Sequence, residues 1–128
     1  MTTVRTRRVH DHVHDPEGTQ GYVVLVDRLW PRGVRKEALR HDLWAKDVAP
    51  STKLRTWFHG LTGQEQSERF DEFVRRYREE LSAESADALG QLVEQLRGEQ
   101  EVTLLFGVRD VEHNHAQILA EVLRRRLR

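Results

Sequence analysis

Cysteine is absent from this chain of 128 residues. Its absence excludes disulfides, thiolate catalysis, iron–sulfur clusters and zinc sites built on thiolates. Long apolar runs are absent as well. No stretch approaches the roughly 18 apolar residues of a membrane span, and the N-terminal sequence MTTVRTRRV lacks the apolar core of a signal peptide. We therefore expect a cytoplasmic protein with no membrane partner.

Net charge is also missing, because 21 Lys and Arg residues balance 21 Asp and Glu residues. This balance argues against a surface that attracts nucleic acid everywhere. The charges are unevenly distributed, however. Residues 28–55 hold eight basic and three acidic side chains, whereas residues 65–101 hold eleven acidic side chains and five arginines. One face is therefore expected to attract anions and another to be acidic.

Motifs that would identify a reaction are missing too. The sequence has no glycine-rich phosphate loop, no GxSxG nucleophile turn and no HExxH metal motif. It requires no cofactor, and whether the chain is an enzyme stays open at this point.

The composition, 38% hydrophobic and 33% charged, is typical of a globular protein. A length of 128 residues corresponds to one ordinary domain. We therefore expect a single domain over residues 1–128.

Two continuous apolar runs predict buried strands. Residues 22–26 have the sequence YVVLV and residues 102–108 have the sequence VTLLFGV. Unbroken β-branched and aliphatic runs are typical of parallel strands that are covered on both faces. A shorter alternation of apolar and basic residues over 4–9 favours a short or edge strand.

Helices are predicted between these runs and after the second one. Ser51 can cap a short helix that ends near residue 58, and Thr62 with Glu65 forms a capping-box pattern before a helix that continues to Leu81. Apolar spacing predicts further helices over 34–47, 85–97 and 111–126. Because strands separated by helices pair in parallel through crossovers, the expected fold class is α/β, with a small, mainly parallel sheet and helices packed on its faces.

The carboxyl ends of parallel strands lie at one edge of a sheet, and this edge binds ligands in open α/β folds. The segments that leave the two buried strands are 27–33 and 109–115. The first contains an acid, two arginines and an indole, followed by Lys36. Arginine recognises carboxylate or phosphate through paired hydrogen bonds, and tryptophan offers a stacking face. The candidate ligand-binding residues here are Arg28, Trp30, Arg32 and Lys36, and Asp27 is a catalytic candidate. The alternative is structural: Asp27 pairs with Arg109 between two strands while Trp30 packs in the core.

The second segment contains Arg109, Asp110, His113, Asn114 and His115. A helix N-terminus beside arginines favours an anion. Imidazole titrates near neutral pH in ordinary surroundings, so His113 or His115 could serve as a catalytic acid or base, oriented by Asp27 or Asp110. Two histidines that are two residues apart point in different directions on a helix, so one of them is expected to face the cleft. The alternative role for Asp110 is that of an N-cap.

Three further histidines alternate along the sequence. If residues 10–14 are extended, His10, His12 and His14 share one face and could hold zinc, nickel or copper. The stretch lacks the distant partner ligands of a closed site, and histidine-rich loops also bind metal adventitiously. His41 and His59 have no evident partner.

Three functional hypotheses follow. The leading one is a site that binds, or acts on, a small anionic molecule such as a phosphate compound, a carboxylate compound or a nucleotide, with Arg28, Arg32, Lys36, Arg109 and Asn114 near Trp30. The alternative is a nucleic-acid-binding or regulatory module that uses the basic stretch 28–55 with Trp30, Trp44 and Trp57. The third is a metal or haem binder that uses the histidines. The oligomeric state is not encoded in any of these patterns.

A series of motifs in this order resembles a known family. The motifs are RVHD (8–11), VLVDRLWPRG (24–33), DLWAKDVAPS (42–51), LRTWF (54–58), the helix 70–81 and RDVEHNHA (109–116). Together they resemble the YeaO-like proteins, which form domain of unknown function 488. The resemblance implies a compact bacterial α/β domain with no established reaction, and it supplies no catalytic residues to carry over. A tyrosine is usual in that family at the position of His10, so a metal role for residues 10–14 would be a local feature of this chain.

Overall fold

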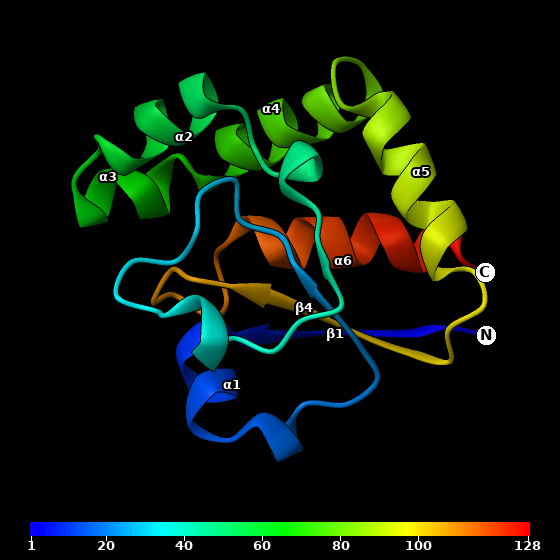
Figure 1. Ribbon diagram of the computed structural model, residues 1–128. Helices are drawn as coiled ribbons and strands as arrows, with labels where there is room; N and C mark the ends of the chain where they lie inside the picture. Colours follow the sequence, from blue (N-terminus) through cyan, green and yellow to red (C-terminus); the bar gives the residue numbers. More distant parts are fainter.

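A computed structural model describes all residues from Met1 to Arg128. Its main chain forms four strands, six helices and three short 3₁₀ turns, arranged in space as in Figure 1. In chain order they are β1 (Thr3–Arg8), α1 (Val9–His14), a 3₁₀ turn (Pro16–Gly18), β2 (Tyr22–Leu25), a 3₁₀ turn (Lys36–Ala38), β3 (Leu43–Trp44), a 3₁₀ turn (Lys46–Val48), α2 (Thr52–His59), α3 (Gly63–Glu68), α4 (Phe70–Ser82), α5 (Ala86–Leu96), β4 (Glu101–Phe106) and α6 (His115–Arg126).

The four strands form one sheet in the order β1-β4-β2-β3, and every neighbouring pair is parallel. The expected α/β class with a parallel sheet is confirmed. The two apolar runs that predicted buried strands are β2 and β4, and they lie next to each other at the centre of the sheet. Their carboxyl ends therefore meet at one edge, as the sequence predicted.

The two central strands bury both of their faces, which explains their continuous apolar sequences. Val24 and Leu104 point into the larger core cluster of 22 buried residues, whereas Val23 and Leu105 point into a smaller cluster of five. In Figure 1, α4, α5 and α6 lie on one side of the sheet and α1 lies on the other. The larger core is thus the one that the long helices cover.

Two helix starts agree with the sequence. The Ser51 hydroxyl accepts a hydrogen bond from Leu54 N at the start of α2, and Thr62 with Glu65 forms a complete capping box at α3. The helix expected from that box to Leu81 is interrupted at Arg69, whose ψ of 12° departs from helical geometry, so it becomes α3 and α4. No helix in the chain combines the length and the apolar character needed to cross a bilayer.

The helix expected over 34–47 is wrong, because this segment adds the fourth strand to the sheet. Leu43 and Trp44 pair with Val24 and Leu25. The Asp42 carboxylate accepts a hydrogen bond from Val23 N at 2.8 Å, which fixes the start of β3 against β2. The helical spacing of the apolar residues is therefore overridden by pairing with the free edge of a buried strand.

The other edge of the sheet belongs to β1. Thr3 N donates to Gln100 O beside β4, and alternate residues of a strand direct their backbone groups to opposite sides, so the Val4 carbonyl faces outward. Arg124 of α6 donates to this carbonyl from Nε at 3.1 Å and from a terminal nitrogen at 2.7 Å. The outward carbonyl is therefore satisfied by a side chain of the same molecule.

Two glycines with positive φ allow two effects of substitution on stability to be compared: the strain of a left-handed backbone and the collision of an added Cβ with neighbouring atoms. Gly21 has φ of 77° and a Cβ there would lie 2.1 Å from Glu101 O, whereas Gly33 has φ of 78° and no atom within 4 Å of a Cβ. We expect Gly33→Ala to lower the free energy of unfolding by about 1 kcal/mol, the strain of a left-handed residue alone. Gly21→Ala should lower it by about 3 kcal/mol or more, because it adds a backbone collision. Urea unfolding measures both, and Gly90→Ala in α5 is the control, expected to stabilise by about 0.5–1 kcal/mol. Equal losses at positions 21 and 33 would contradict this account of Gly21.

Candidate functional site

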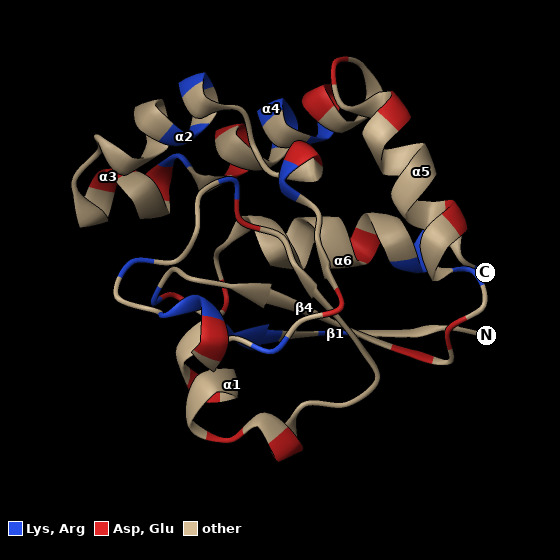
Figure 2. Cartoon of the chain, viewed as in Figure 1, with Lys and Arg blue, Asp and Glu red and all other residues tan.

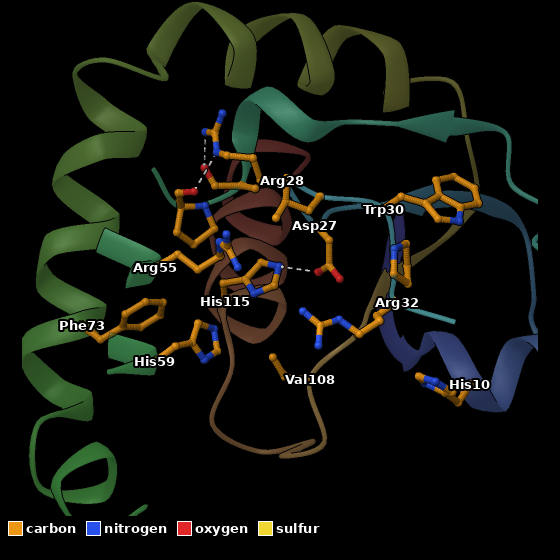
Figure 3. Close-up of a pocket in the computed structure, with 15 residues that line it drawn as sticks. His10, Asp27, Arg28, Trp30, Arg32, Arg55, His59, Phe73, Val108 and His115 are labelled. Atoms are coloured by element: carbon orange, nitrogen blue, oxygen red, sulfur yellow. Dashed lines mark hydrogen bonds and ion pairs between the residues drawn. The ribbon is translucent and has the colours of Figure 1, made fainter. Parts of the chain in front are cut away.

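A cavity of about 480 Å³ opens at the carboxyl edge of β2 and β4. Residues from seven parts of the chain surround it (Figure 3): α1, the loop after β2, the residues before α2, α2 itself, α4, the segment after β4 and the start of α6. The lining includes His10, Asp27, Arg28, Trp30, Arg32, Pro50, Arg55, His59, Phe73, Gly107, Val108 and His115. Most of segment 27–33 lines this cavity, whereas His115 is the only residue of segment 109–115 that does.

The pair formed by His115 and Asp27 lies at the base of this cavity. His115 Nε2 lies 3.0 Å from Val26 O and 3.1 Å from Asp27 Oδ1, and the two side chains are only 12% and 18% exposed. Because a carbonyl and a carboxylate can only accept, the imidazole carries a proton on Nε2. Its hydrogen bond is directed at Val26 O, so Asp27 Oδ1 attracts the ring without receiving that bond. A neutral His115 therefore leaves Nδ1 as the acceptor.

Gly107 makes room for the Asp27 carboxylate. A Cβ at position 107 would lie 2.7 Å from Asp27 Oδ2, so only glycine fits without displacement of the carboxylate. Trp44 Nε1 donates to Asp27 O at 2.7 Å and fixes the backbone of the same residue. The structural alternative, an ion pair between Asp27 and Arg109, is wrong: Arg109 is exposed, and the partner of Asp27 is His115.

Arg28 is directed at main-chain carbonyls. Its Nε donates to Pro50 O at 2.9 Å and a terminal nitrogen donates to Ala49 O at 3.0 Å, and Figure 3 marks both bonds. The guanidinium still contributes positive charge to the cavity, but two of its donors are already occupied. Arg28 therefore holds the two middle residues of the segment 48–51, which we call the strap.

Two buried or half-buried side chains of α4 hold the other residues of the strap. Tyr77 donates from its hydroxyl to Val48 O at 2.5 Å, and burial raises the pKa of this hydroxyl, so it stays a donor. Glu80 accepts from Ser51 N at 2.8 Å and from Ser51 Oγ at 2.6 Å. Each of the four residues of the strap is thus anchored by a side chain, and α2 begins directly after it.

Helix α2 contributes two cavity residues that the sequence analysis did not select, Arg55 and His59. They are four residues apart and lie on one face of the helix. Arg55 forms no ion pair, and its Nε is buried without a hydrogen-bond partner. Burial lowers the pKa of His59, the positive charges of Arg55 and His115 lower it further, and Asp27 opposes them. The four-residue spacing indicates in the sequence that Arg55 and His59 share a face of α2, but no pattern indicates that this face lines a cavity.

The remaining candidates of the first segment differ in position. Arg32 is exposed and forms no ion pair, and Figure 3 shows its guanidinium extending into the cavity toward His115. Trp30 lines the cavity but donates from Nε1 to Val34 O at 2.7 Å and packs edge-on against Trp44. Lys36 is exposed in a 3₁₀ turn and lines no part of the cavity.

A second cavity of about 450 Å³ adjoins the first and contains the remaining candidates of the second segment. It shares four lining residues with the first cavity, namely His59, Phe73, Val108 and His115. Arg109, Asp110, His113 and Asn114 line it as well. His113 and His115 thus both line the second cavity, and only His115 also reaches the first.

The N-cap of α6 is Asn114, and the expected N-cap role of Asp110 is wrong. Asn114 Oδ1 accepts from Gln117 N, and α6 begins at His115 instead of residue 111. Asp110 accepts from the backbone N–H groups of Glu112 and His113, which close a turn in front of the helix. The hydrogen bond from His113 N is the main reason that the pKa of Asp110 is lowered. The Glu112 N–H and the His113 ring lower this pKa further, whereas partial burial of the carboxyl group raises it.

The extended conformation that would have placed His10, His12 and His14 on one face is wrong, because these residues belong to α1. His12 is buried: its Nε2 donates to Arg40 O at 2.7 Å, and its Nδ1 lies 2.6 Å from the Thr19 hydroxyl. Both of its nitrogens are therefore occupied. No cluster of three His, Cys, Asp or Glu residues in the chain could hold a metal ion.

The uneven charge distribution of the sequence persists in the fold. Figure 2 shows basic positions in the loop after β2 and in α2, and acidic positions toward the end of α4 and in α5. The three tryptophans of the nucleic-acid hypothesis are engaged within the protein: Trp30 and Trp44 pack on each other, and the Arg76 guanidinium lies 4.3 Å from the Trp57 ring. The basic side of the protein thus surrounds a cavity and offers no row of free aromatic faces.

Comparison with known proteins gives a family and uncharacterised relatives. The family model DUF488-N3i, described as the inactive DUF488-N3 subclade, matches residues 3–128. Uncharacterized protein Rv3073c of Mycobacterium tuberculosis strain H37Rv is 46% identical over 122 residues, which cover 95% of this chain and 94% of that protein. Uncharacterized protein YeaO of Escherichia coli K12 is 39% identical over 113 residues, covering 88% of this chain and 92% of YeaO. No solved structure matches.

The environment of His59 generates a pH prediction. We expect His59 to titrate below 6.5, its value without the protein environment, because charging it is opposed by burial and by the charges of Arg55 and His115. Since the folded-state pKa is lowered, stability from this group is complete above pH 6.5 and declines as the pH falls toward the folded-state value. Titration of the imidazole signals by NMR measures the pKa, and Arg55→Gln should raise it. An unchanged or lower pKa in Arg55→Gln contradicts the placement of these two residues.

The role of Arg28 predicts a loss of stability. Arg28→Met removes two charge-assisted hydrogen bonds and leaves the carbonyls of Ala49 and Pro50 without these donors, so we expect the free energy of unfolding to fall by about 2–3 kcal/mol. Arg32→Met is the control, because Arg32 is exposed and unpaired; it should change the free energy by less than about 0.5 kcal/mol. Urea unfolding of both variants measures the difference, and equal values would show that Arg28 does not hold the strap.

Proposed function

The chain belongs to the YeaO-like DUF488 family, and from that membership and the site geometry we propose that it binds a small anionic molecule in the first cavity without transforming it. The bound group would be a phosphate or a carboxylate. Arg55 and Arg32 are its direct partners in this proposal, and Arg28 supports it through charge.

The observation that carries the proposal is the unpaired guanidinium of Arg55. Its Nε is buried in the cavity wall without an acceptor, and such a donor is unfavourable unless a ligand or water satisfies it. Arg32 also has no carboxylate partner, and Asp27 is the only acidic residue of the lining. An anion that accepts hydrogen bonds from Arg55 and Arg32 would satisfy both and offset their mutual repulsion.

Two further observations support an anion over a neutral ligand. His115 is the first residue of α6, so the positive end of a helix of 12 residues lies beside the cavity. Burial is the main cause of the lowered pKa of His59; the positive charges of Arg55 and His115 add to it, and Asp27 opposes them. The description of the subclade as inactive favours binding over catalysis. In this proposal Asp27 and His115 form the floor of the binding site, and no chemical step is assigned to them or to His113.

Titration calorimetry at low ionic strength with inorganic phosphate, acetate and citrate tests the proposal. We expect saturable binding of at least one of these anions. Arg55→Gln should weaken it at least tenfold, which corresponds to about 1.4 kcal/mol. Lys53→Gln is the matched control, because it removes one positive charge from the same helix at an exposed position outside the cavity, and it should change the affinity less than twofold.

Two results would overturn the proposal. One is the absence of binding of every anion at millimolar concentration in 20 mM salt. The other is an equal loss of affinity in Arg55→Gln and Lys53→Gln, which would mean that the anion responds to the general charge of the surface and not to this cavity.

A further inference from the structure

The second cavity adjoins the anion site and differs from it in chemistry. The two cavities meet along a common wall of His59, Phe73, Val108 and His115. Their volumes, about 480 Å³ and 450 Å³, are each in the range of small-molecule sites. The two cavities therefore adjoin, and one ligand could contact the lining of both.

The charges of the two cavities differ. Three arginines and one carboxylate line the first cavity. In the second, the positive charge of Arg109 is balanced by Asp110, whose pKa is lowered mainly by the hydrogen bond from His113 N. The first cavity thus suits the anionic end of a ligand, and the second suits an uncharged part.

The second cavity combines apolar wall with free hydrogen-bonding atoms. Phe58, Phe73 and Val108 form its apolar part. Gln66 donates from Nε2 to Phe58 O, and its amide oxygen makes no hydrogen bond within the protein. The His113 ring bonds Asp110 through Nδ1, which leaves Nε2 free in an exposed position. These two atoms can accept hydrogen bonds from hydroxyl or amino groups while apolar surface contacts a ring.

We propose that the ligand is a mononucleotide, whose phosphate binds Arg55 and Arg32 in the first cavity and whose nucleoside extends into the second. This inference rests on the proposed function, because the phosphate supplies the anchor. A nucleoside has the features that the second cavity complements: an uncharged planar base with apolar faces, and sugar hydroxyl and base amino groups that can donate. A carboxylate or phosphate without such a body leaves the second cavity unfilled.

A panel of four probes separates this inference from the proposed function. Calorimetry compares inorganic phosphate, ribose 5-phosphate, adenosine 5′-monophosphate and uridine 5′-monophosphate, each titrated into the full chain at low ionic strength. Phosphate binding tests the anion site by itself. We expect at least one nucleotide to bind tenfold or more tightly than ribose 5-phosphate, because the base adds contacts in the second cavity.

A cavity-filling variant locates the base. Gly63 lines the second cavity but not the first. Its backbone does not require glycine and a Cβ there meets open space, so Gly63→Leu is expected to fold and to narrow the second cavity. Gly90→Leu is the matched control, since Gly90 also lies in a helix with open space at its Cβ and lines neither cavity. Gly63→Leu should reduce the preference for nucleotide over ribose 5-phosphate to less than threefold while phosphate affinity stays within twofold. Gly90→Leu should change neither.

Each outcome is informative. If phosphate binds but both nucleotides bind no more tightly than ribose 5-phosphate, the nucleotide inference is overturned and the anion site stands. If the nucleotide preference survives in Gly63→Leu, the base does not occupy the second cavity and the inference is wrong. If none of the four probes binds, the nucleotide inference falls, and the anion site falls with it if acetate and citrate also fail to bind.

Discussion

The anchoring of the strap is the constraint on which the site depends. Residues 48–51 pair with no strand, yet side chains hold all four of them. Arg28 and Tyr77 donate hydrogen bonds to the carbonyls of residues 48–50, and Glu80 accepts hydrogen bonds from the backbone N–H and the hydroxyl of Ser51. Because α2 begins at the end of the strap, these bonds fix where the helix starts and which face it turns toward the sheet. Two side chains of α4 and one from the loop after β2 thus determine the positions of the Arg55 guanidinium and the His59 imidazole on α2.

The other half of the site is fixed by the sheet. Parallel pairing of β2 and β4 places Asp27 beside Gly107, and the missing Cβ at position 107 lets the carboxylate lie close to the backbone. His115, at the first turn of α6, then meets both Val26 O and Asp27. The floor of the cavity is therefore set by strand pairing and one wall by the strap, whereas Arg32 comes from the loop after β2.

The sequence predicted what local patterns encode, and it failed where distant residues decide. Strands β2 and β4, their shared edge and the caps at Ser51 and Thr62 follow from short-range rules. Strand β3 was missed because its two residues pair with β2 against their own helical spacing. Arg55 and His59 were missed as site residues because nothing near them in the chain shows that the strap turns their face of α2 toward His115. Asp27 was expected to have either a functional role or Arg109 as its partner; its observed partner, His115, is 88 positions away, and the fold alone brings them together.

The contact between Arg124 and the Val4 carbonyl has a consequence for self-association. An exposed strand can recruit the strand of another molecule only if its outward carbonyls and amides are available. At Val4 the acceptor is already occupied twice by a guanidinium of the same chain, so an incoming strand would first have to displace Arg124. The last helix therefore does more than cover the core. It also blocks one register of intermolecular sheet extension along β1, which is a form of protection against aggregation that the short strand does not provide by itself.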